Sequence, residues 1–497
     1  MNFEVFFMKL SELTTNLEVK EIIGDLDLDI KGIYHNSREI KRDFLFICIK
    51  GFTFDGHNFI DDALNRGAST LVVEKEVPLR PGITIIRVSD SRKALAFLAN
   101  KFYGFPSRNL KLIGVTGTNG KTTITYMLRT IFQEAGFKTG LLGTAQNIVG
   151  DNINLSRMTT MESVDLQRTL KEMVEQKNRY SVMEVSSHAL QLSRVEGCDF
   201  DVAIFTNISK EHFEIHKNFS NYLNAKKKLF LSLNNSRKEA SQKFAVINVD
   251  EEHSREFLDC NRVNLMTYGI EKEARVKARK IKIELKSLSF AVETPVGQSE
   301  ISLNFGGKYN VYNALAAIAT AITQGIPLNL ISRALSKFSG APGRYKLLEY
   351  GQNYTIIIDF AHNYHGLGNI LKNLRSFTHR NLITIFGHGG EKYNRVRVTM
   401  GEVIGRYSDY SIITADNPKS EDPMEIAQEI ERGVKKTAKD YIIITDRVKA
   451  IKHALEKAQE GDIVLIAGKG PENEQIYHNR VIHHNDEEVV RNILTGR

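Results

Sequence analysis

The segment Gly117–Thr123 combines two glycines with a lysine and hydroxyl side chains, in the order Gly-Thr-Asn-Gly-Lys-Thr-Thr. Glycines let backbone N–H groups converge on an anion, as in loops that hold nucleotide phosphates. Lys121 would then reach the β- and γ-phosphates, and the hydroxyl of Thr122 would hold Mg²⁺. The strict pattern for such loops requires glycine where Val115 stands. A glycine-rich turn without a ligand is the alternative, but it gives the Lys-Thr pair no packing role. The residues expected to contact the nucleotide are Gly117, Thr118, Asn119, Gly120, Lys121, Thr122 and Thr123.

A second polar group follows the apolar run that begins at Tyr180. Glu184, Ser186 and His188 end this run, and the carboxyl end of a buried strand is where α/β proteins bind ligands. Glu184 is therefore our first candidate for a metal ligand. His212 and His216 lie four residues apart, as zinc ligands on a helix do. We set that alternative aside because neither a glutamate general base nor a third ligand accompanies them.

The elements around these residues follow from hydrophobic periodicity. Residues 112–115 are apolar and predict a buried strand, while the apolar positions in 124–132 recur at helical spacing. A further strand in 138–143 would complete a βαβ unit of a doubly wound sheet. In the last 150 residues or so, strands near 354–359, 382–386, 410–414, 441–444 and 462–467 alternate with helical stretches. These patterns predict an α/β protein.

The chain of 497 residues is too long for one core and suggests about three domains. We predict a small N-terminal α/β domain at 1–106, a central phosphate-loop domain with a doubly wound sheet at 107–338, and a C-terminal Rossmann-like domain at 339–497. The segments 104–107 and 339–344, rich in glycine and proline, would be the hinges. Strand-like alternation in 281–292 assigns that part to the central domain.

Composition excludes several classes of protein. No apolar run approaches the ~20 residues that a membrane span needs. The apolar first ten residues carry Glu4 where a signal peptide has basic residues. Three isolated cysteines fit a reducing cytoplasm, and we expect a cytoplasmic monomer. The net charge of +8 is spread along the chain, which favours anionic small-molecule substrates over nucleic acid.

The spelling of residues 116–122 resembles the nucleotide loop of the Mur ligase superfamily, ATP-dependent enzymes that join an amino acid to a carboxylate through an acyl phosphate. The resemblance extends from about residue 32 to 475. The spelling from Ser37 to Glu74 is similar to the N-terminal domain of the UDP-N-acetylmuramoyl-dipeptide ligases, where it holds uridine diphosphate. The family thus implies ATP and Mg²⁺ as cofactors and a peptidoglycan precursor as substrate.

The resemblance also implies roles for individual residues. Lys226 stands where the family has a carbamylated lysine that serves a second Mg²⁺, and we expect Lys121, Glu184, His212 and Lys226 to be catalytic. The expected metal ligands are Thr122, Glu184, His212 and the Lys226 carbamate. The expected ATP contacts outside the loop are Asn310, Asn313, Arg344 and Asp359. The expected contacts to the uridine substrate are Ser37, Thr159, Thr160, Ser186 and Arg194. The expected amino-acid site comprises Lys392, Asp416, Asn417, Pro418, Lys419, Gly468 and Glu472.

Asn310 and Asn313 also stand out without the resemblance. They lie three residues apart on one helix face, suited to bracketing an adenine. The alternative for the pair is a helix cap plus a surface amide.

Several positions depart from the family spelling. They are Asn36, Met158, Met161, Glu211, the run Glu391-Lys392-Tyr393, and Pro471. Asn36 could loosen the turn beside Ser37. The departures at Met161, Glu391 to Tyr393 and Pro471 motivate one alternative, a non-catalytic paralogue. A second alternative is a folylpolyglutamate synthase, which shares the central and C-terminal domains, although the spelling from Ser37 to Glu74 argues against it.

The added amino acid is inferred from charge. Relatives that add meso-diaminopimelate carry an arginine at the position of Lys419, and this chain has lysines at 392 and 419. Diaminopimelate is therefore favoured over L-lysine or another amino acid, with Glu472 expected to bind its distal amine.

Overall fold

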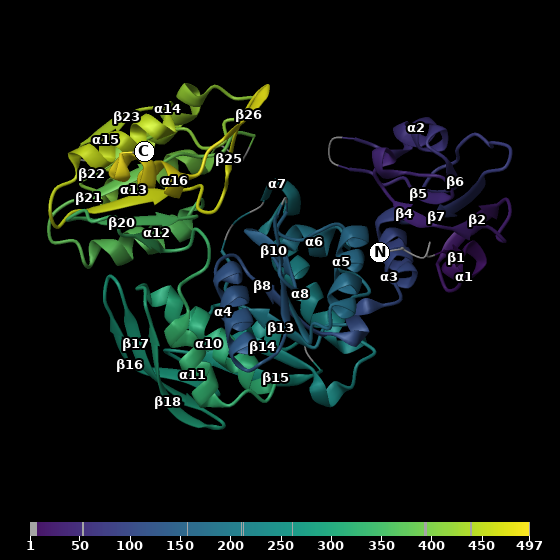
Figure 1. Cartoon of the computed structure of the whole chain (residues 1–497), viewed down its shortest axis with the longest axis horizontal. Helices are drawn as coiled ribbons and strands as arrows, with labels where there is room; N and C mark the ends of the chain where they lie inside the picture. Colours follow the sequence, from purple (N-terminus) through teal and green to yellow (C-terminus); the bar gives the residue numbers. More distant parts are fainter. Residues whose placement is uncertain are drawn as a thin grey trace.

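The computed structural model describes residues 7–51, 54–156, 158–209, 211, 213–260, 262–391, 395–437 and 440–496. In these residues three main sheets, covered by helices, follow one another along the chain. The N-terminal sheet (purple) and the C-terminal sheet (green to yellow) flank the central sheet on opposite sides of the view in Figure 1. The α/β class predicted from the sequence is confirmed.

The N-terminal sheet has the strand order β2-β7-β6-β5-β4, parallel from β4 to β7, with β2 antiparallel at the edge. Its strands are β2 (Val19–Ile23), β4 (Gly32–Tyr34), β5 (Phe44–Ile47), β6 (Ala68–Val73) and β7 (Thr84–Val88). A short pair, β1 (Met8–Lys9) and β3 (Asp29–Ile30), lies beside it. Its helices are α1 (Leu10–Thr14), α2 (Ile60–Asn65) and α3 (Ser91–Phe102).

The central sheet has the order β11-β10-β9-β12-β8-β13-β14-β15-β16-β17-β18. In the part of this order that runs β9-β12-β8-β13-β14-β15-β16, neighbouring strands are parallel, and the antiparallel pairs β10–β11 and β17–β18 extend the two edges. The strand β8 is buried on both faces, as an apolar run in a parallel sheet should be. The strands are β8 (Lys111–Thr116), β9 (Thr139–Leu142), β10 (Gln146–Val149), β11 (Asn152–Leu155), β12 (Tyr180–Glu184), β13 (Val202–Phe205), β14 (Phe244–Asn248), β15 (Asn264–Gly269), β16 (Val276–Ile283), β17 (Leu288–Thr294) and β18 (Gly297–Leu303).

Helices cover both faces of the central sheet. The alanine-rich α10 (Lys308–Thr323) is apolar nearly all round, and it is buried beside α4 (Lys121–Glu134) in the largest core cluster. This packing places the start of α10 next to the phosphate loop. The other helices are α5 (Ser163–Glu175), α6 (Ser187–Gln191), α7 (Phe213–His216), α8 (Phe219–Asn235), α9 (Ser254–Leu258) and α11 (Leu328–Lys337).

The C-terminal sheet has the order β19-β20-β24-β21-β22-β23, parallel except for β19. Its strands are β19 (Lys346–Leu348), β20 (Thr355–Asp359), β21 (Leu382–Phe386), β22 (Tyr410–Ile413), β23 (Tyr441–Ile443) and β24 (Ile463–Ala467), followed by the hairpin β25 (Glu474–Tyr477) and β26 (Arg480–His483). Its helices are α12 (Tyr364–Arg375), α13 (Arg395–Tyr407), α14 (Pro423–Thr437), α15 (Arg447–Lys457) and α16 (Asp486–Thr495). The five strands predicted in this region match β20 to β24. Among the described residues, no helix has the length and apolar character needed to cross a membrane.

Candidate active site

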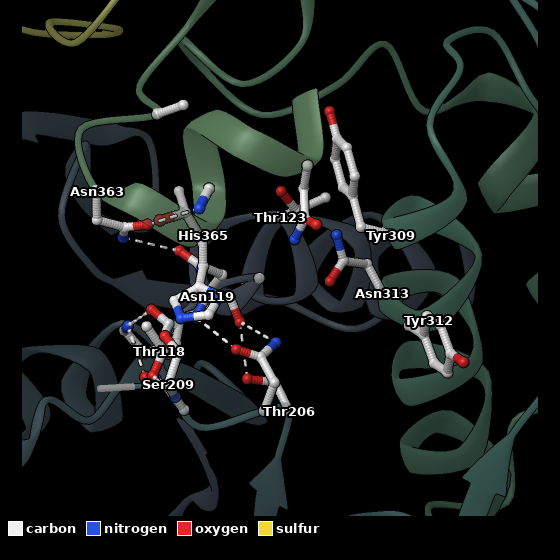
Figure 2. Close-up of a pocket in the computed structure, with 18 of the residues that line it drawn as sticks. Thr118, Asn119, Thr123, Thr206, Ser209, Tyr309, Tyr312, Asn313, Asn363 and His365 are labelled. Carbon is white, nitrogen blue, oxygen red and sulfur yellow. Dashed lines mark hydrogen bonds between the residues drawn. The ribbon is translucent and has the colours of Figure 1, made fainter. Parts of the chain in front are cut away.

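A cavity of about 1850 Å³ lies where the central domain faces the C-terminal one. The phosphate loop, the carboxyl ends of β12 and β13, the start of α10, the segment after α11 and the first turns of α12 line it. Figure 2 shows part of its wall. The predicted residues that line it are Gly117, Thr118, Asn119, Gly120, Lys121, Thr122, Thr123, Thr159, Thr160, Glu184, Ser186, Arg194, Lys226, Asn310, Asn313, Arg344 and Asp359.

The phosphate loop has the geometry of an anion site. Gly117 and Gly120 have φ values of 148° and 92°, which side-chain-bearing residues rarely adopt. A Cβ on Gly117 would lie 1.8 Å from Oγ1 of Thr206, so only glycine fits there. The helix α4 begins at Lys121 without a side-chain cap, which leaves the N–H groups of its first turn for a ligand.

Two residues after β13 hold this loop in shape. The Asn207 carbonyl accepts the Thr118 N–H at 2.8 Å, and its side-chain oxygen accepts the Asn119 N–H at 3.0 Å. The Thr206 hydroxyl donates to the Asn119 carbonyl at 2.7 Å (Figure 2). We did not predict these roles, because only the pairing of β13 with β8 brings Thr206 and Asn207 beside the loop.

Two lysines converge on the loop from different helices. Lys121 Nζ donates to the carbonyls of Gly117 at 2.9 Å and Thr118 at 2.8 Å. Lys226 Nζ, on α8, donates to the same Gly117 carbonyl at 2.9 Å. Burial lowers the pKa of Lys121 and lowers that of Lys226 well below its ordinary value; the Lys121 charge lowers the Lys226 pKa further. Burial and crowding thus disfavour the charged forms of the two amino groups, and an incoming anion would favour those charged forms.

Glu184 ends β12 inside the cavity and is almost fully buried. Its Oε1 accepts the Thr122 hydroxyl at 2.9 Å and the Thr144 N–H at 2.8 Å. Its Oε2 accepts the Thr144 hydroxyl at 3.0 Å. A carboxylate beside a hydroxyl is the oxygen donor set that Mg²⁺ prefers, so Thr122 and Glu184 fit the ion that the family implies. Thr144 was missed by sequence reasoning, because nothing in its local spelling marks it.

The expected histidine ligand cannot be placed, since His212 lies outside the described residues. His216, its partner in the zinc alternative, hydrogen-bonds the Ser187 hydroxyl at 3.0 Å. Within the described ranges no group of three or more His, Cys, Asp or Glu side chains is arranged to hold a metal ion.

The loop between β11 and α5 joins Glu184 to the predicted substrate contacts. The Thr159 hydroxyl hydrogen-bonds Thr144 Oγ1 at 3.1 Å, and the Thr160 hydroxyl donates to the Glu184 carbonyl at 2.9 Å. The Ser186 N–H donates to Thr160 Oγ1 at 3.1 Å. Arg194 donates to the Thr160 carbonyl at 3.1 Å. These expected substrate residues therefore form one continuous wall with Glu184.

Asn310 and Asn313 lie in the first turns of α10 and are buried. Asn313 Nδ2 donates to Asn310 Oδ1 at 3.0 Å, and Asn310 Nδ2 donates to the Gly306 carbonyl at 2.7 Å. Asn313 also packs so closely on the loop that a Cβ on Gly120 would lie 2.4 Å from its Oδ1. The alternative of a helix cap plus a surface amide does not hold, because Gly307 is the N-cap residue and both side chains are buried.

The hinge before β19 reaches back to the phosphate loop. An Arg344 N–H donates to Thr122 Oγ1 at 3.2 Å, and the guanidinium lies over the Phe360 ring at 4.2 Å. Burial lowers the pKa of Arg344, a shift that the Asp359 carboxylate opposes. Asp359 accepts the N–H groups of Tyr345 and Ala361, each at 2.8 Å, and burial raises the pKa of its carboxyl. Asp359 thus fixes the hinge that aims Arg344.

The predicted amino-acid site forms a second cluster, on the loops that follow β22 and β24. Asn417 Nδ2 donates to Glu472 Oε2 at 2.8 Å. Gly468, in the same cluster, donates its N–H to the Asp359 carbonyl at 3.1 Å. Lys419 Nζ pairs with Glu391 at 3.1 Å. Pro418 and Asp416 are part of the first loop, whereas Lys392 lies outside the described residues.

Ser37 lies in the N-terminal domain, apart from the cavity wall. Its hydroxyl hydrogen-bonds Asp62 and holds the pKa of that carboxyl below its ordinary value. Asn36 Oδ1 accepts the Arg38 N–H at 3.2 Å, so the departure at Asn36 leaves the turn capped.

Comparisons with known proteins agree across the chain. The family model described as Mur ligase middle domain matches residues 115–321, the Mur ligase glutamate ligase domain matches 343–470, and the Mur ligase family catalytic domain matches 29–103. The chain is 42% identical over 487 residues to the UDP-N-acetylmuramoyl-L-alanyl-D-glutamate–2,6-diaminopimelate ligase of Caldanaerobacter subterraneus subsp. tengcongensis, covering 98% of this chain and 99% of that protein.

It is also 43% identical to the ligase of the same name from Geobacillus kaustophilus, over 99% of this chain and 100% of that protein. A solved structure of a ligase with this name superimposes with a TM-score of 0.68 at 27% identity, covering 99% of both chains.

Proposed function

The chain belongs to the Mur ligase family, and from that premise we propose that it is an ATP-dependent ligase that adds the third amino acid to UDP-N-acetylmuramoyl-L-alanyl-D-glutamate. The relatives that match it over nearly their whole length carry that activity in their names. The acid would be activated as an acyl phosphate, and the product would be a peptidoglycan precursor.

One observation carries the proposal. The carboxylate of Glu184 contacts Thr122 of the phosphate loop on one side and Thr144 on the other, and Thr144 Oγ1 hydrogen-bonds Thr159 of the predicted substrate loop. The nucleotide and the carboxylate substrate would therefore meet across a single side chain. That arrangement suits attack of a carboxylate oxygen on the γ-phosphorus with loss of ADP.

Each side chain has a role in this reaction. Lys121 and the free N–H groups of α4 would bind the phosphates and stabilise charge on the transferred phosphoryl group. Arg194 and Thr160 would hold the acid. Arg344, now on Thr122, would exchange that hydroxyl for phosphate oxygens. Mg²⁺, held by Thr122, Glu184, His212 and carbamylated Lys226, would offset repulsion between the carboxylate and the phosphate.

In the second half of the reaction the amine of the amino acid attacks the acyl carbon, and inorganic phosphate leaves as the amide bond forms. We assign the uridine nucleotide to domain 1–106 with Ser37, ATP to domain 107–338 with Asn310 and Asn313 at the adenine, and the amino acid to domain 339–497. Asp359 would keep the hinge and Arg344 in place beside the nucleotide.

We propose meso-diaminopimelate as the amino acid. Its distal carboxylate would bind Lys419 and Lys392, and its distal amine would bind Glu472. Lysine is a weaker partner than arginine for a carboxylate because two parallel hydrogen bonds become one point-charge contact. Selectivity over L-lysine is therefore expected to be modest.

The test measures ADP release with ATP, with or without the uridine dipeptide, and identifies the product by mass spectrometry. Release that requires both the dipeptide and an amino acid, with a product heavier by one diaminopimelate residue, supports the proposal. Release with a folate and glutamate instead would support a folylpolyglutamate synthase. No release with any acid would indicate a non-catalytic paralogue.

A further inference from the structure

A fully buried lysine stands behind the predicted amino-acid site. The Lys469 side chain is 0% exposed, and its Nζ donates to Glu472 Oε2 at 2.9 Å, Asn417 Oδ1 at 3.1 Å and Asp416 Oδ1 at 3.4 Å. An ammonium group has three N–H donors, and all three are used here. The acceptors come from two loops, one after β22 and one after β24.

We propose that Lys469 is a positioning residue that fixes Glu472, Asn417 and Asp416 in the geometry that receives the amino acid, an inference that rests on the proposed function. Its contacts close a ring, because Asn417 also donates to Glu472 Oε2 at 2.8 Å. Lys469 and Asn417 both donate to Oε2 of Glu472, and neither of these contacts uses Oε1. Oε1 is the oxygen assigned to the incoming ammonium group.

Charge gives a second reason for a lysine at this place. Asp416 and Glu472 are both acidic, and without a cation between them their carboxylates would repel each other. The ammonium lies within 3.4 Å of both. It therefore permits two carboxylates to stand together and receive one substrate.

The backbones of the two loops are already anchored by other residues. Arg447 donates to the Ala467 carbonyl at 3.1 Å. It also forms an ion pair with Asp486, and both side chains of this pair are 0% exposed. Gln475 Nε2 donates to the Asp416 carbonyl at 2.8 Å. The main-chain path of the loops thus does not depend on Lys469, whose contacts all go to side chains that are assigned to the substrate.

The same loop packs on the hinge from its other side. A Cβ on Gly470 would lie 2.6 Å from Cβ of Phe360 and 2.9 Å from the Gly343 carbonyl. The residue after Lys469 is therefore fixed against the segment that carries Arg344. A small shift of the Lys469 side chain would therefore move the side chains that are assigned to the substrate and leave the hinge in place.

The test replaces Lys469 by methionine, which is unbranched and only one atom shorter and which removes the charge and the donors. Lys243→Met is the matched control, because Lys243 is also buried and its Nζ donates to the Leu233 and Ser236 carbonyls in the central domain. Both variants lose a buried ammonium, but only Lys469 touches the predicted site. The measurements are the KM for diaminopimelate, ATP and the uridine dipeptide, the kcat, and the thermal unfolding temperature.

We expect Lys469→Met to raise the KM for the amino acid about tenfold or more, because a side chain misplaced by an ångström weakens a preorganised site strongly. The KM values for ATP and the dipeptide should stay near those of the unaltered enzyme. Oxygen-isotope exchange within ATP, measured with the dipeptide and without amino acid, should also persist. Lys469→Gln keeps two donors without the charge. Its KM for the amino acid should lie between that of the unaltered enzyme and that of Lys469→Met.

An unchanged KM for the amino acid in Lys469→Met overturns the proposal. A rise shared by all three substrates, or matched by Lys243→Met, also overturns it, since that indicates a general loss of stability. If neither Lys469 variant folds, the ammonium serves the domain and not the site, and the proposal is again wrong. Absence of ligation by the unaltered enzyme would instead reject the proposed function.

Discussion

Replacement of Glu184 by glutamine separates a charged role of this residue from a packing role. Glutamine has the same shape and retains one oxygen for the Thr122 hydroxyl and the Thr144 N–H. The new amide nitrogen would face Thr144 Oγ1, which can rotate to accept. The substitution therefore removes the negative charge and changes little else.

The expected effects on stability and on turnover differ in size. Hydrogen bonds to a charged group contribute about 1.5–3 kcal/mol and neutral ones about 0.5–1.5 kcal/mol, so weakening these contacts costs about 1–2 kcal/mol. Relief from burying a carboxylate offsets part of that cost. Loss of a preorganised charge at the phosphoryl group should instead lower turnover about 10²–10³-fold. Glu184→Gln should thus be a folded protein with little activity.

The assay combines ADP release at saturating substrates, a titration with Mg²⁺ and thermal unfolding in the same buffer. Thr144→Val is the control, since it removes a hydroxyl that contacts Glu184 and Thr159 but keeps the charge and the backbone N–H. We expect it to lose about tenfold or less, by analogy with a single neutral hydrogen bond. Turnover of Glu184→Gln within about threefold of the original, with unchanged Mg²⁺ dependence, would refute the reasoning.

Three further substitutions test Lys121 and Lys226 beside the phosphate loop and Lys419 in the predicted amino-acid site. Lys121→Ala should abolish ligation, and circular dichroism should show an unchanged fold, because the hydrogen bonds of its Nζ within the described residues go to the loop carbonyls; normal turnover would reject the phosphate-loop assignment. Lys226→Ala should be nearly inactive and partly rescued by formate or acetate, which can replace a carbamate; a normal rate without rescue would make Lys226 a structural residue. Lys419→Ala should narrow the preference for diaminopimelate over L-lysine in a competition assay, and an unchanged product ratio would remove Lys419 from the specificity site.

Local patterns were enough to predict the strand, loop and helix of the phosphate site. An apolar run, two glycines and apolar residues at helical spacing each act within a few residues, and β8 and α4 lie where they indicate. The same holds for the strands of the C-terminal sheet, each a short apolar run bounded by polar loops. Glu184 could be chosen because it ends such a run.

The supporting residues could not be predicted in this way. Thr206 and Asn207 brace a loop about 90 residues earlier in the chain, and they do so because β13 pairs with β8. Thr144 reaches Glu184 across the pairing of β9 with β12. Lys469 meets Asp416 through the arrangement of the C-terminal sheet. Contacts of this kind depend on strand order, which no local spelling contains.

The charge of Lys419 in the predicted amino-acid site shows the same limit of prediction from the sequence. The sequence predicts that Lys419 binds the distal carboxylate of the amino acid. It does not show that another side chain of the protein already pairs with the Lys419 ammonium group. The structure places the Glu391 carboxylate 3.1 Å from Lys419 Nζ and 2.8 Å from the Ser420 hydroxyl. An incoming carboxylate must therefore compete with Glu391 for the ammonium group, and this competition lowers the affinity expected from charge alone.

The positions of both clusters follow from the topology of two parallel sheets. Ligands of such sheets bind beyond the carboxyl ends of the strands, and Glu184 ends β12 while Asp359 ends β20. Asp359 accepts the N–H of Gly468 through its carbonyl and fixes the hinge through its carboxylate, and from that hinge Arg344 reaches Thr122. The carboxyl ends of the two sheets thus meet at one hinge. On the proposed function, an acid activated on the central sheet and an amine held on the C-terminal sheet would be brought to the same place by the fold itself.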